Sequence, residues 1–307
     1  MEQNILLIGS RGFLGSHVRK MLIKKSIKFI EIKGKSDLDI TNLESFREFV
    51  EDKNIKSIIN CAAFVGGISF GYKYQADLLK INSLMATNLY EVANLSGINN
   101  VINPISNCAY PGNLTVYDEK DFWEGPPHDS VFNYALSKRL FVALGKSFYE
   151  QYGISSYNVV LSNMYGPGDH FEEERSHALG ALIKKIYLAK INNNNSIDIW
   201  GTGRPVREWL YVEDGAKALV KSLELTEGNY LYNVGINKGS SIIEIAELIS
   251  KHMDWSGDFN LNVDMPDGVM RKTVNGDLGG KLLNWSPEVK LNDGIKKTVE
   301  WYINNNE

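Results

Sequence analysis

The sequence has few of the residues and runs that mark several common protein classes. Its 307 residues include only two cysteines, Cys61 and Cys108, and no metal-ligand spacing connects either of them to a histidine. So few cysteines argue against a disulfide scaffold and for a reducing compartment. No apolar run approaches the roughly 18 residues that span a membrane, and no secretory leader pattern opens the chain. We therefore expect a cytoplasmic protein without a metal site.

Basic blocks are also missing. The formal net charge is −4, with 43% hydrophobic and 23% charged residues, which is ordinary for a globular protein. A chain without a basic block is a poor candidate for a nucleic-acid partner, and we expect neither nucleic acid nor a membrane as partner. A phosphate-bearing small molecule remains compatible, because local charge rather than net charge binds a phosphate.

Short apolar runs alternate with helical patterns in the first half of the chain. The runs predict strands at 5–8, 29–32, 57–59, 101–105 and 157–161. The helical spacings predict helices at 13–22, 43–50, 76–93 and 134–152, the second opened by a capping box at 41–44. This alternation is typical of a parallel sheet with helices on both faces, and largely apolar strands are typical of strands buried on both sides.

The rhythm changes after Gly166. Helices are predicted at 177–189, 212–225, 241–252 and 292–303, with short strands at 197–200 and 209–212. We expect a Rossmann-type doubly wound α/β fold with a smaller C-terminal α/β substrate domain. The predicted division assigns 1–165, with 207–236, to the NADP-binding domain and 166–206 and 237–307 to the substrate domain.

A glycine-rich turn follows the first predicted strand and opens the first helix. Glycine is needed where backbone approaches a pyrophosphate or a neighbouring strand closely. The helix N-terminus offers free N–H groups and partial positive charge to phosphates. The spacing G-x-x-G-x-x-G in this context predicts a dinucleotide site formed by Gly9, Ser10, Arg11, Gly12, Phe13, Leu14 and Gly15.

The choice of nicotinamide cofactor depends on the second strand. Glu31 stands where an acidic residue would bind the ribose hydroxyls of NAD. Arg11, Lys33 and Lys35 would suit the extra 2′-phosphate of NADP. The three basic groups favour NADP, and NAD remains the alternative.

A tyrosine and a lysine four residues apart predict the catalytic helix. Tyr134 and Lys138 lie on one helix face. A free tyrosine has a pKa near ~10, so we expect the Lys138 ammonium to lower the pKa of Tyr134 and make it an acid–base catalyst. Ser106, at the end of the fourth strand, can hydrogen-bond the same substrate carbonyl.

Glycine turn, strand-end serine and Tyr-x-x-x-Lys in this order resemble the short-chain dehydrogenase/reductases. The length and the second domain resemble their extended branch, the NAD-dependent epimerase/dehydratase family. Further segments across nearly the whole chain are similar to the GDP-L-fucose synthase family, which are 4-keto-6-deoxymannose epimerase-reductases. These segments are 65–68, 106–108, 163–167, 176–177, 200–203, 207–208, 266–268 and 271–272.

The resemblance implies a two-part reaction on a nucleotide-linked 4-keto sugar, GDP-4-keto-6-deoxymannose or a relative. Cys108 and His177 would invert C3 and C5 as an acid–base pair, and NADPH would then reduce C4. Tyr134 would stabilise the enolate and protonate the C4 oxygen. Lys138 would tune Tyr134 and hold the nicotinamide ribose. The structural alternatives are an inert core thiol at Cys108 and a solvated helix start at His177.

The resemblance also implies binding residues. Ala62, Asn163 and His177 would contact the cofactor. Candidates for substrate binding are Lys185, Trp200, Arg207, Asp267 and Lys272, of which Arg207 and Lys272 suit phosphates best and Trp200 would stack or lie in the core. We expect a homodimer, because the family commonly pairs the two long helices.

The sequence departs from the family at Phe64, where a basic residue is usual, at Asn107, where a second serine is usual, and in the acidic loop 168–174. These changes put the sugar in doubt more than the chemistry. The alternatives are a nucleotide-sugar 4-epimerase with tightly bound NAD and a non-catalytic NADP-binding regulator. A 4,6-dehydratase is disfavoured, because Asn107-Cys108 stands where that family carries an acid pair.

Overall fold

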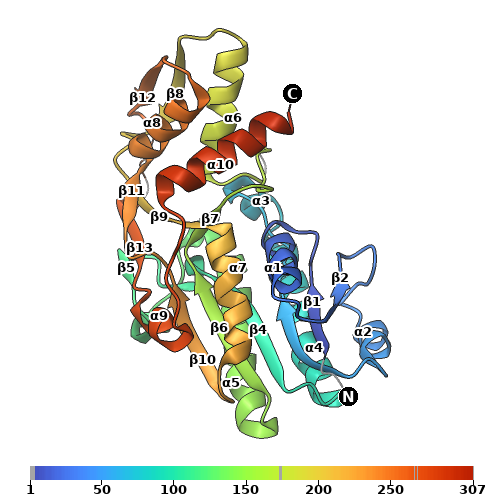
Figure 1. The fold of residues 1–307 in the computed structure, drawn as a ribbon. Coiled ribbons are helices and arrows are strands. Elements are labelled where there is room, and N and C mark those ends of the chain that lie inside the picture. The colour runs from blue at the N-terminus through green and yellow to red at the C-terminus, as the bar shows by residue number, and fades with distance from the viewer. Residues whose placement is uncertain (1–3, 173–174, 266, 268, 307) are drawn as a thin grey trace.

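The computed structural model describes residues 4–172, 175–265, 267 and 269–306. It has a large parallel sheet with helices on both faces and, above it in Figure 1, a smaller body of helices and short strands. Within these ranges no helix is long and apolar enough to cross a membrane. Glu173, Glu174, Pro266 and Gly268 of the motifs named above lie outside the described residues.

The large sheet has six strands in the order β10-β6-β4-β3-β1-β2, and every neighbouring pair is parallel. The inner strands β3 and β6 are almost completely buried, and the other strands are buried in part, which explains their apolar runs. The strands are β1 (Asn4–Ile8), β2 (Phe29–Ile32), β3 (Ile55–Asn60), β4 (Asn100–Ser106), β6 (Ser155–Leu161) and β10 (Asn229–Val234).

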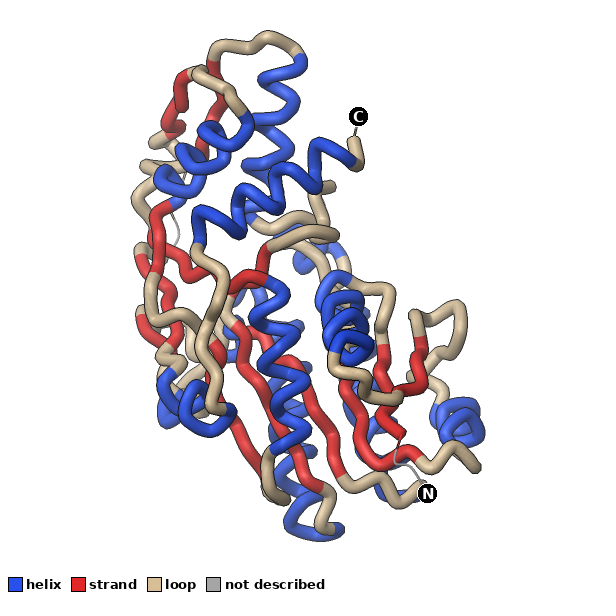
Figure 2. Tube along the Cα trace, in the orientation of Figure 1, coloured by secondary structure: helices blue, strands red, loops and turns tan. Residues whose placement is uncertain are grey.

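Helices cover both faces of this sheet (Figure 2). On one face α1 (Phe13–Lys24) packs against α7 (Val212–Lys221), and Val18 and Leu219 are among the buried residues of that core. The other face carries three helices, α2 (Leu43–Val50), α4 (Gln75–Leu95) and α5 (Phe132–Tyr152), which share a second core. This arrangement confirms the predicted doubly wound α/β fold.

The smaller body has its own core between three helices and short strands. The helices are α6 (Ala178–Ile191), α8 (Ile242–Met253) and α10 (Leu291–Asn304). A second sheet, ordered β11-β9-β13-β5 with β7 also on β9, lies between this body and the large sheet (Figure 1). Its strands are β5 (Val116–Tyr117), β7 (Asn163–Tyr165), β9 (Val206–Tyr211), β11 (Gly239–Ser241) and β13 (Arg271–Val274).

The remaining elements are short. A two-stranded sheet joins β8 (Ser196–Trp200) to β12 (Asp258–Asn262). Two short helices are α3 (Ile68–Lys73) and α9 (Asp277–Leu283). Single 3-10 turns are η1 (Asn107–Ala109), η2 (Glu119–Asp121), η3 (Asp129–Val131) and η4 (Ser222–Glu224).

The predicted capping box at 41–44 is wrong. Asn42 caps α2, and its side-chain oxygen accepts a hydrogen bond from the Ser45 N–H at 3.0 Å. The Thr41 hydroxyl is engaged elsewhere, because it donates to Asp39 at 2.7 Å. The helix predicted at 212–225 also ends early, at Lys221, and the chain continues as the 3-10 turn η4.

Candidate active site

The carboxyl ends of the parallel strands bring the predicted residues to one edge of the large sheet. The order of strands reverses between β1 and β3, because β2 lies outside β1 whereas β4, β6 and β10 follow β3. Open α/β sheets bind ligands at such a switch point. The chain positions at or just beyond these strand ends are Gly9, Lys33, Ala62, Ser106 and Asn163.

The glycine turn fits a pyrophosphate. Gly9 has φ of 78°, in the left-handed region, and a Cβ there would lie 2.8 Å from the Ala62 nitrogen. A Cβ on Gly15 would overlap the Gly9 carbonyl oxygen. Gly12 precedes α1, and the helix has neither a side-chain cap nor an acidic residue in its first turn. The first-turn N–H groups therefore remain available to an anion.

The end of β2 bears on the choice of cofactor. The Glu31 carboxylate pairs with Arg19 of α1 at 2.9 Å, so it is already engaged. Lys35 pairs with Asp39 at 3.0 Å. Arg11 is largely exposed, with only a 4.0 Å approach to Asp37. The backbone N–H of Arg11 donates to the Lys33 carbonyl at 3.3 Å, which holds these two residues side by side.

Tyr134 and Lys138 lie one turn apart on α5, with the Lys138 Nζ 5.6 Å from the centre of the Tyr134 ring. Lys138 is buried, and its Nζ donates to the Pro104 carbonyl on β4 at 3.1 Å. Burial lowers the pKa of Lys138 to about 8. Burial, aided by Cys108, raises the pKa of Tyr134.

We expected Lys138 to lower the pKa of Tyr134. In the protein without its cofactor this expectation is wrong, because the pKa of Tyr134 is raised. Desolvation of the phenolate dominates the pKa of Tyr134, although the buried ammonium of Lys138 lies close by. Tyr134 consequently stays protonated at neutral pH, which is the form that a proton donor needs.

Ser106 and Cys108 share the turn η1. The Ser106 Oγ accepts a hydrogen bond from the Cys108 N–H at 3.3 Å. The Ser106 hydroxyl can also donate one hydrogen, either to the Cys108 thiol, whose pKa it lowers, or to a substrate carbonyl. Burial raises the pKa of the Cys108 thiol, although Ser106 and the cations Lys138 and Lys272 oppose this. Cys108 is partly accessible to solvent, so a protonated thiol stands within reach of a ligand.

Two cations stand side by side near this turn. Arg207 on β9 and Lys272 on β13 are register partners. Burial lowers the pKa of both, and the Arg207 charge lowers the pKa of Lys272 further. In the part of the chain that the structure describes, neither forms an ion pair with a carboxylate, and the Arg207 Nη1 donates to the Val206 carbonyl. Adjacent cations without a counterion are suited to a phosphate or diphosphate.

His177 precedes α6 and makes no capping hydrogen bond with its side chain. The ring is reached by solvent, yet burial among protein atoms, and then the charge of His170, lowers its pKa. The imidazole is therefore neutral at pH 7 and able to accept a proton. None of the described contacts joins His177 to Tyr134 or Cys108, so its part in the site stays a prediction.

The other predicted substrate residues lie outside this cluster. Trp200, at the end of β8, is 67% exposed. Both carboxyl oxygens of Asp267 are occupied by Thr202, whose N–H and hydroxyl donate at 2.6 and 2.7 Å. The Lys185 Nζ donates to the Asp198 carbonyl at 3.2 Å. Contact between these three side chains and a ligand stays a prediction.

Glu208 is a residue of this region that the sequence analysis missed. It is completely buried, and its carboxylate accepts from the N–H groups of Ile236 at 2.6 Å and Val274 at 2.8 Å. Its carbonyl accepts from Asn163 Nδ2 at 3.0 Å. Glu208 thus joins β9 and β13, which carry the two cations, to the end of β10. The available signal was its place in the family-like segment 207–208, to which the sequence analysis gave no structural role.

Phe64, one of the departures from the family, belongs to an aromatic cluster. Its ring centre lies 5.1 Å from that of Phe70, which lies 4.6 Å from that of Tyr74. Buried Asn82 accepts from the Phe64 N–H and donates to the Phe64 carbonyl, both at 2.9 Å. The segment before Val65 is therefore a fixed apolar wall rather than a charged one.

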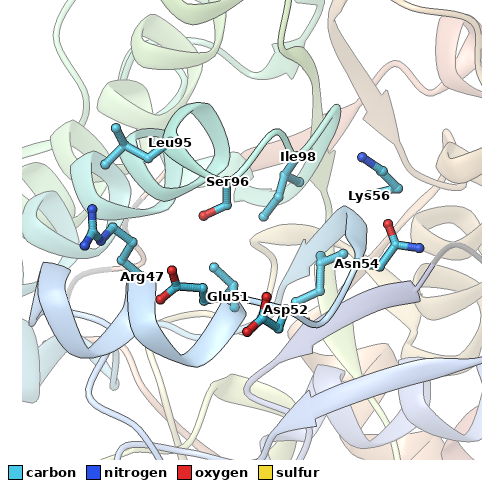
Figure 3. A pocket seen from close by; sticks show the side chains of 10 residues that line it. Arg47, Glu51, Asp52, Asn54, Lys56, Leu95, Ser96 and Ile98 are labelled. Carbon is cyan, nitrogen blue, oxygen red and sulfur yellow. The ribbon is translucent and has the colours of Figure 1, made fainter.

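A hollow of about 250 Å³ lies far from these residues, where α2 and α4 end and β3 begins (Figure 3). Arg47, Glu51 and Lys56 line it with other side chains. It opens at the amino ends of the parallel strands, opposite the switch point. It contains none of the chemistry described above.

A family model described as the NAD dependent epimerase/dehydratase family matches residues 5–235. The chain belongs to this family. The predicted family and its enzymatic character are thereby confirmed: the protein is an oxidoreductase/epimerase. The match begins in β1 and runs one residue past β10, so it spans the whole six-stranded sheet.

Members of the family resemble this chain over nearly its full length. GDP-L-fucose synthase 1 of Arabidopsis thaliana is 30% identical over 98% of this chain and 93% of its own. GDP-L-fucose synthase of Escherichia coli K12 is 28% identical over 100% and 98%. The crystal structure of an NADP-bound GDP-L-fucose synthetase from Naegleria fowleri has a TM-score of 0.90 at 25% identity, covering 99% and 95%.

Proposed function

We propose that this enzyme uses NADPH to reduce a GDP-linked 4-keto sugar after inverting the carbons beside the ketone. One observation carries the proposal. Ser106, Cys108, Tyr134 and Lys138 gather where β4 meets α5, at the sheet edge that holds the glycine turn. Reduction of a ketone needs only Ser106, Tyr134 and Lys138. The Cys108 thiol adds a group that can donate a proton to a carbon atom, which inversion requires. The GDP-L-fucose synthase relatives support the substrate class.

NADP(H) is the cofactor that these relatives and the NADP-bound neighbour support. Residues 9–15 would hold the pyrophosphate, and Arg11, Lys33 and Lys35 the 2′-phosphate. Ala62, Asn163 and His177 are the further predicted contacts, with Lys138 at the nicotinamide ribose. We assign 1–165 and 207–236 to cofactor binding and the remaining segments to substrate binding.

The reduction uses residues of α5 and β4. NADPH, when bound, supplies the hydride that adds to C4 of the sugar. Tyr134, protonated in its buried setting, donates a proton to the C4 oxygen. Ser106 donates a hydrogen bond to the same oxygen, because its own oxygen is already satisfied by the Cys108 N–H. Lys138 holds a positive charge beside the ring while it is protonated, and solvent replaces the proton that Tyr134 has donated.

The inversion uses a proton acceptor and a proton donor. A 4-ketone acidifies the hydrogens at C3 and C5, and removal of one gives an enolate whose oxygen lies at Tyr134 and Ser106. His177 is neutral and can accept that proton, whereas Cys108 carries a proton that it can return to the opposite face. Bonds to hydrogen break and form without net oxidation. Arg207 and Lys272 would bind the diphosphate and so fix the sugar against Cys108.

The test is NADPH oxidation with GDP-4-keto-6-deoxymannose, followed by identification of the product. We expect NADPH to be consumed and C3 and C5 to be inverted. Consumption without inversion would leave a C4 reductase. No consumption, together with interconversion at C4 of a nucleotide hexose, would favour the redox-neutral 4-epimerase. NADPH binding without any turnover would favour a regulator.

Removing two of the basic groups at the β2 end should weaken NADPH binding. We expect Arg11→Ala with Lys33→Ala to raise the Kd for NADPH about tenfold and to leave NADH nearly unchanged, because only NADPH carries the 2′-phosphate. Fluorescence titration measures both constants. Lys20→Ala, an exposed lysine of α1, is the matched control. Equal losses for the two cofactors would contradict the assignment.

The two long helices are the proposed dimer surface. Several large apolar side chains on α4 and α5 are exposed, among them Leu84, Leu95, Tyr149 and Tyr152. Light scattering should give twice the 34.5 kDa of one chain, and Leu84→Glu should shift the protein to monomer, whereas Leu188→Glu on α6 should not. A monomeric unaltered protein would contradict the proposal. Both cysteines are free, which fits the proposed cytoplasmic setting.

A further inference from the structure

Arg139 follows Lys138 on α5 and has an unusual set of contacts for a surface-helix arginine. Its Nε donates a 2.7 Å hydrogen bond to the carbonyl of Ala109, the residue after Cys108. Its guanidinium carbon lies 5.6 Å from the ring centres of both Phe122 and Trp123. One side chain thus connects the catalytic helix, the cysteine turn and the segment at 122–123.

The Arg139 guanidinium is held at an energetic cost. Its Nη2 is buried and has no hydrogen-bond partner among the described residues. Burial lowers the pKa of Arg139, and Cys108 is close enough to oppose that shift. Buried donors without partners are rare in native proteins and call for an explanation. The two aromatic faces compensate part of the charge burial, but they do not explain why a cation is kept there.

We propose that Arg139 is a positioning residue for Cys108, an inference that rests on the epimerase step proposed above. Two hydrogen bonds fix the short turn η1 from opposite ends: the Ser106 Oγ accepts from the Cys108 N–H, and the Ala109 carbonyl accepts from Arg139. Because Arg139 and Tyr134 belong to one rigid helix, the bond to Ala109 sets the thiol relative to the phenol. Inversion requires both the thiol and the phenol on one sugar, whereas reduction requires Tyr134, Ser106 and Lys138 but not the thiol.

The stacking partners define how Arg139 itself is oriented. Phe122 is completely buried and Trp123 is half exposed, and their rings meet edge to face at 5.1 Å. The guanidinium carbon lies 5.6 Å from both ring centres, and these contacts together with the bond to Ala109 hold the side chain in place before any ligand binds. A lysine would supply a cation but neither the planar group nor the fixed donor direction.

The experiment separates inversion from reduction in Arg139→Met, which retains an unbranched apolar stem. Deuterium incorporated from D₂O into the sugar with inverted C3 and C5 reports inversion, and this rate is called exchange below. NADPH oxidation with the already inverted 4-keto sugar reports reduction. We expect exchange to fall about tenfold to a hundredfold, since misplacement of a reacting group by about 1 Å has effects of that size. We expect reduction to fall far less.

Arg139→Lys should retain part of the exchange rate, because it keeps the charge and one donor. Lys146→Met, an exposed lysine of the same helix, is the matched control and should change neither rate. If circular dichroism shows that Arg139→Met does not fold, Arg139→Lys provides the same comparison, with a smaller difference between the loss of exchange and the loss of reduction.

Three outcomes would overturn the inference. Exchange at the unaltered rate in Arg139→Met would show that the turn does not need the bond. Equal losses of exchange and reduction would show that Arg139 supports the site as a whole. Absence of exchange in the unaltered enzyme would overturn the epimerase step itself, and that result is distinct because it appears before any substitution is made.

Discussion

Tyr134→Phe should lower the rate of NADPH oxidation with a 4-keto sugar by about 10²- to 10⁴-fold, the usual contribution of a general acid. The change removes only a hydroxyl, so the ring stays beneath Lys138 and the packing of α5 is retained. Stopped-flow absorbance at saturating NADPH measures the loss.

Binding should persist in this variant. The glycine turn lies on β1 and α1, away from the Tyr134 hydroxyl, so the Kd for NADPH should stay near that of the unaltered enzyme. Tyr152→Phe, at the exposed end of the same helix, is the matched control. Unchanged turnover in Tyr134→Phe would overturn the reduction mechanism.

The pH dependence of reduction should follow Lys138. Because burial lowers its pKa to about 8, Lys138 is charged below that pH and neutral above it. Reduction consumes a proton that passes through Tyr134, so kcat/KM should be level below about pH 8 and fall about tenfold per pH unit above it. Lys138→Arg, which stays charged, should remove the break. A break that survives in Lys138→Arg would assign it to another group.

Cys108→Ser should abolish most deuterium incorporation into the sugar with inverted C3 and C5 while sparing reduction of the already inverted sugar. A serine hydroxyl is a far weaker acid than a thiol, and it occupies nearly the same space. The Cys108 N–H can still donate to Ser106, so the turn η1 is retained. We expect exchange to fall about 10²- to 10⁴-fold, as followed by NMR of the sugar protons.

Cys61 provides the comparison. Burial raises the pKa of its thiol to about 12, and it follows β3 rather than β4. Cys61→Ala should therefore leave exchange in place. Normal exchange in Cys108→Ser would return that thiol to a structural role.

Much of the cofactor half could be predicted from the sequence because its signals are local. The run at 29–32 matches β2, and the helix expected at 134–152 differs from α5 by two residues at its start. Six strands, β5, β7, β10, β11, β12 and β13, were not predicted. Strands of two to six residues show too little alternation to be detected, and they exist through pairing with β6, β8, β9 or one another.

The candidate site divides in the same way. The positions of Ser106, Tyr134 and Lys138 follow from motif and strand order, although their roles stay predictions. The role of Glu31 could not be predicted in this way. Its distance along the chain from the glycine turn suggested a contact with the ribose, but its carboxylate forms an ion pair with Arg19 of the neighbouring helix α1. Partners of that kind depend on which helix faces which strand.

By itself the sequence determined the family, the parallel sheet and the glycine turn, because each rests on short motifs and local spacings that can be read directly from the chain. Only the tertiary structure decided that Arg207 stands beside Lys272, that Glu208 joins two sheets and that Arg139 donates a hydrogen bond to the Ala109 carbonyl. Those contacts join segments that are distant in the chain. Strand register and helix packing set such contacts, and neither leaves a local pattern in the sequence.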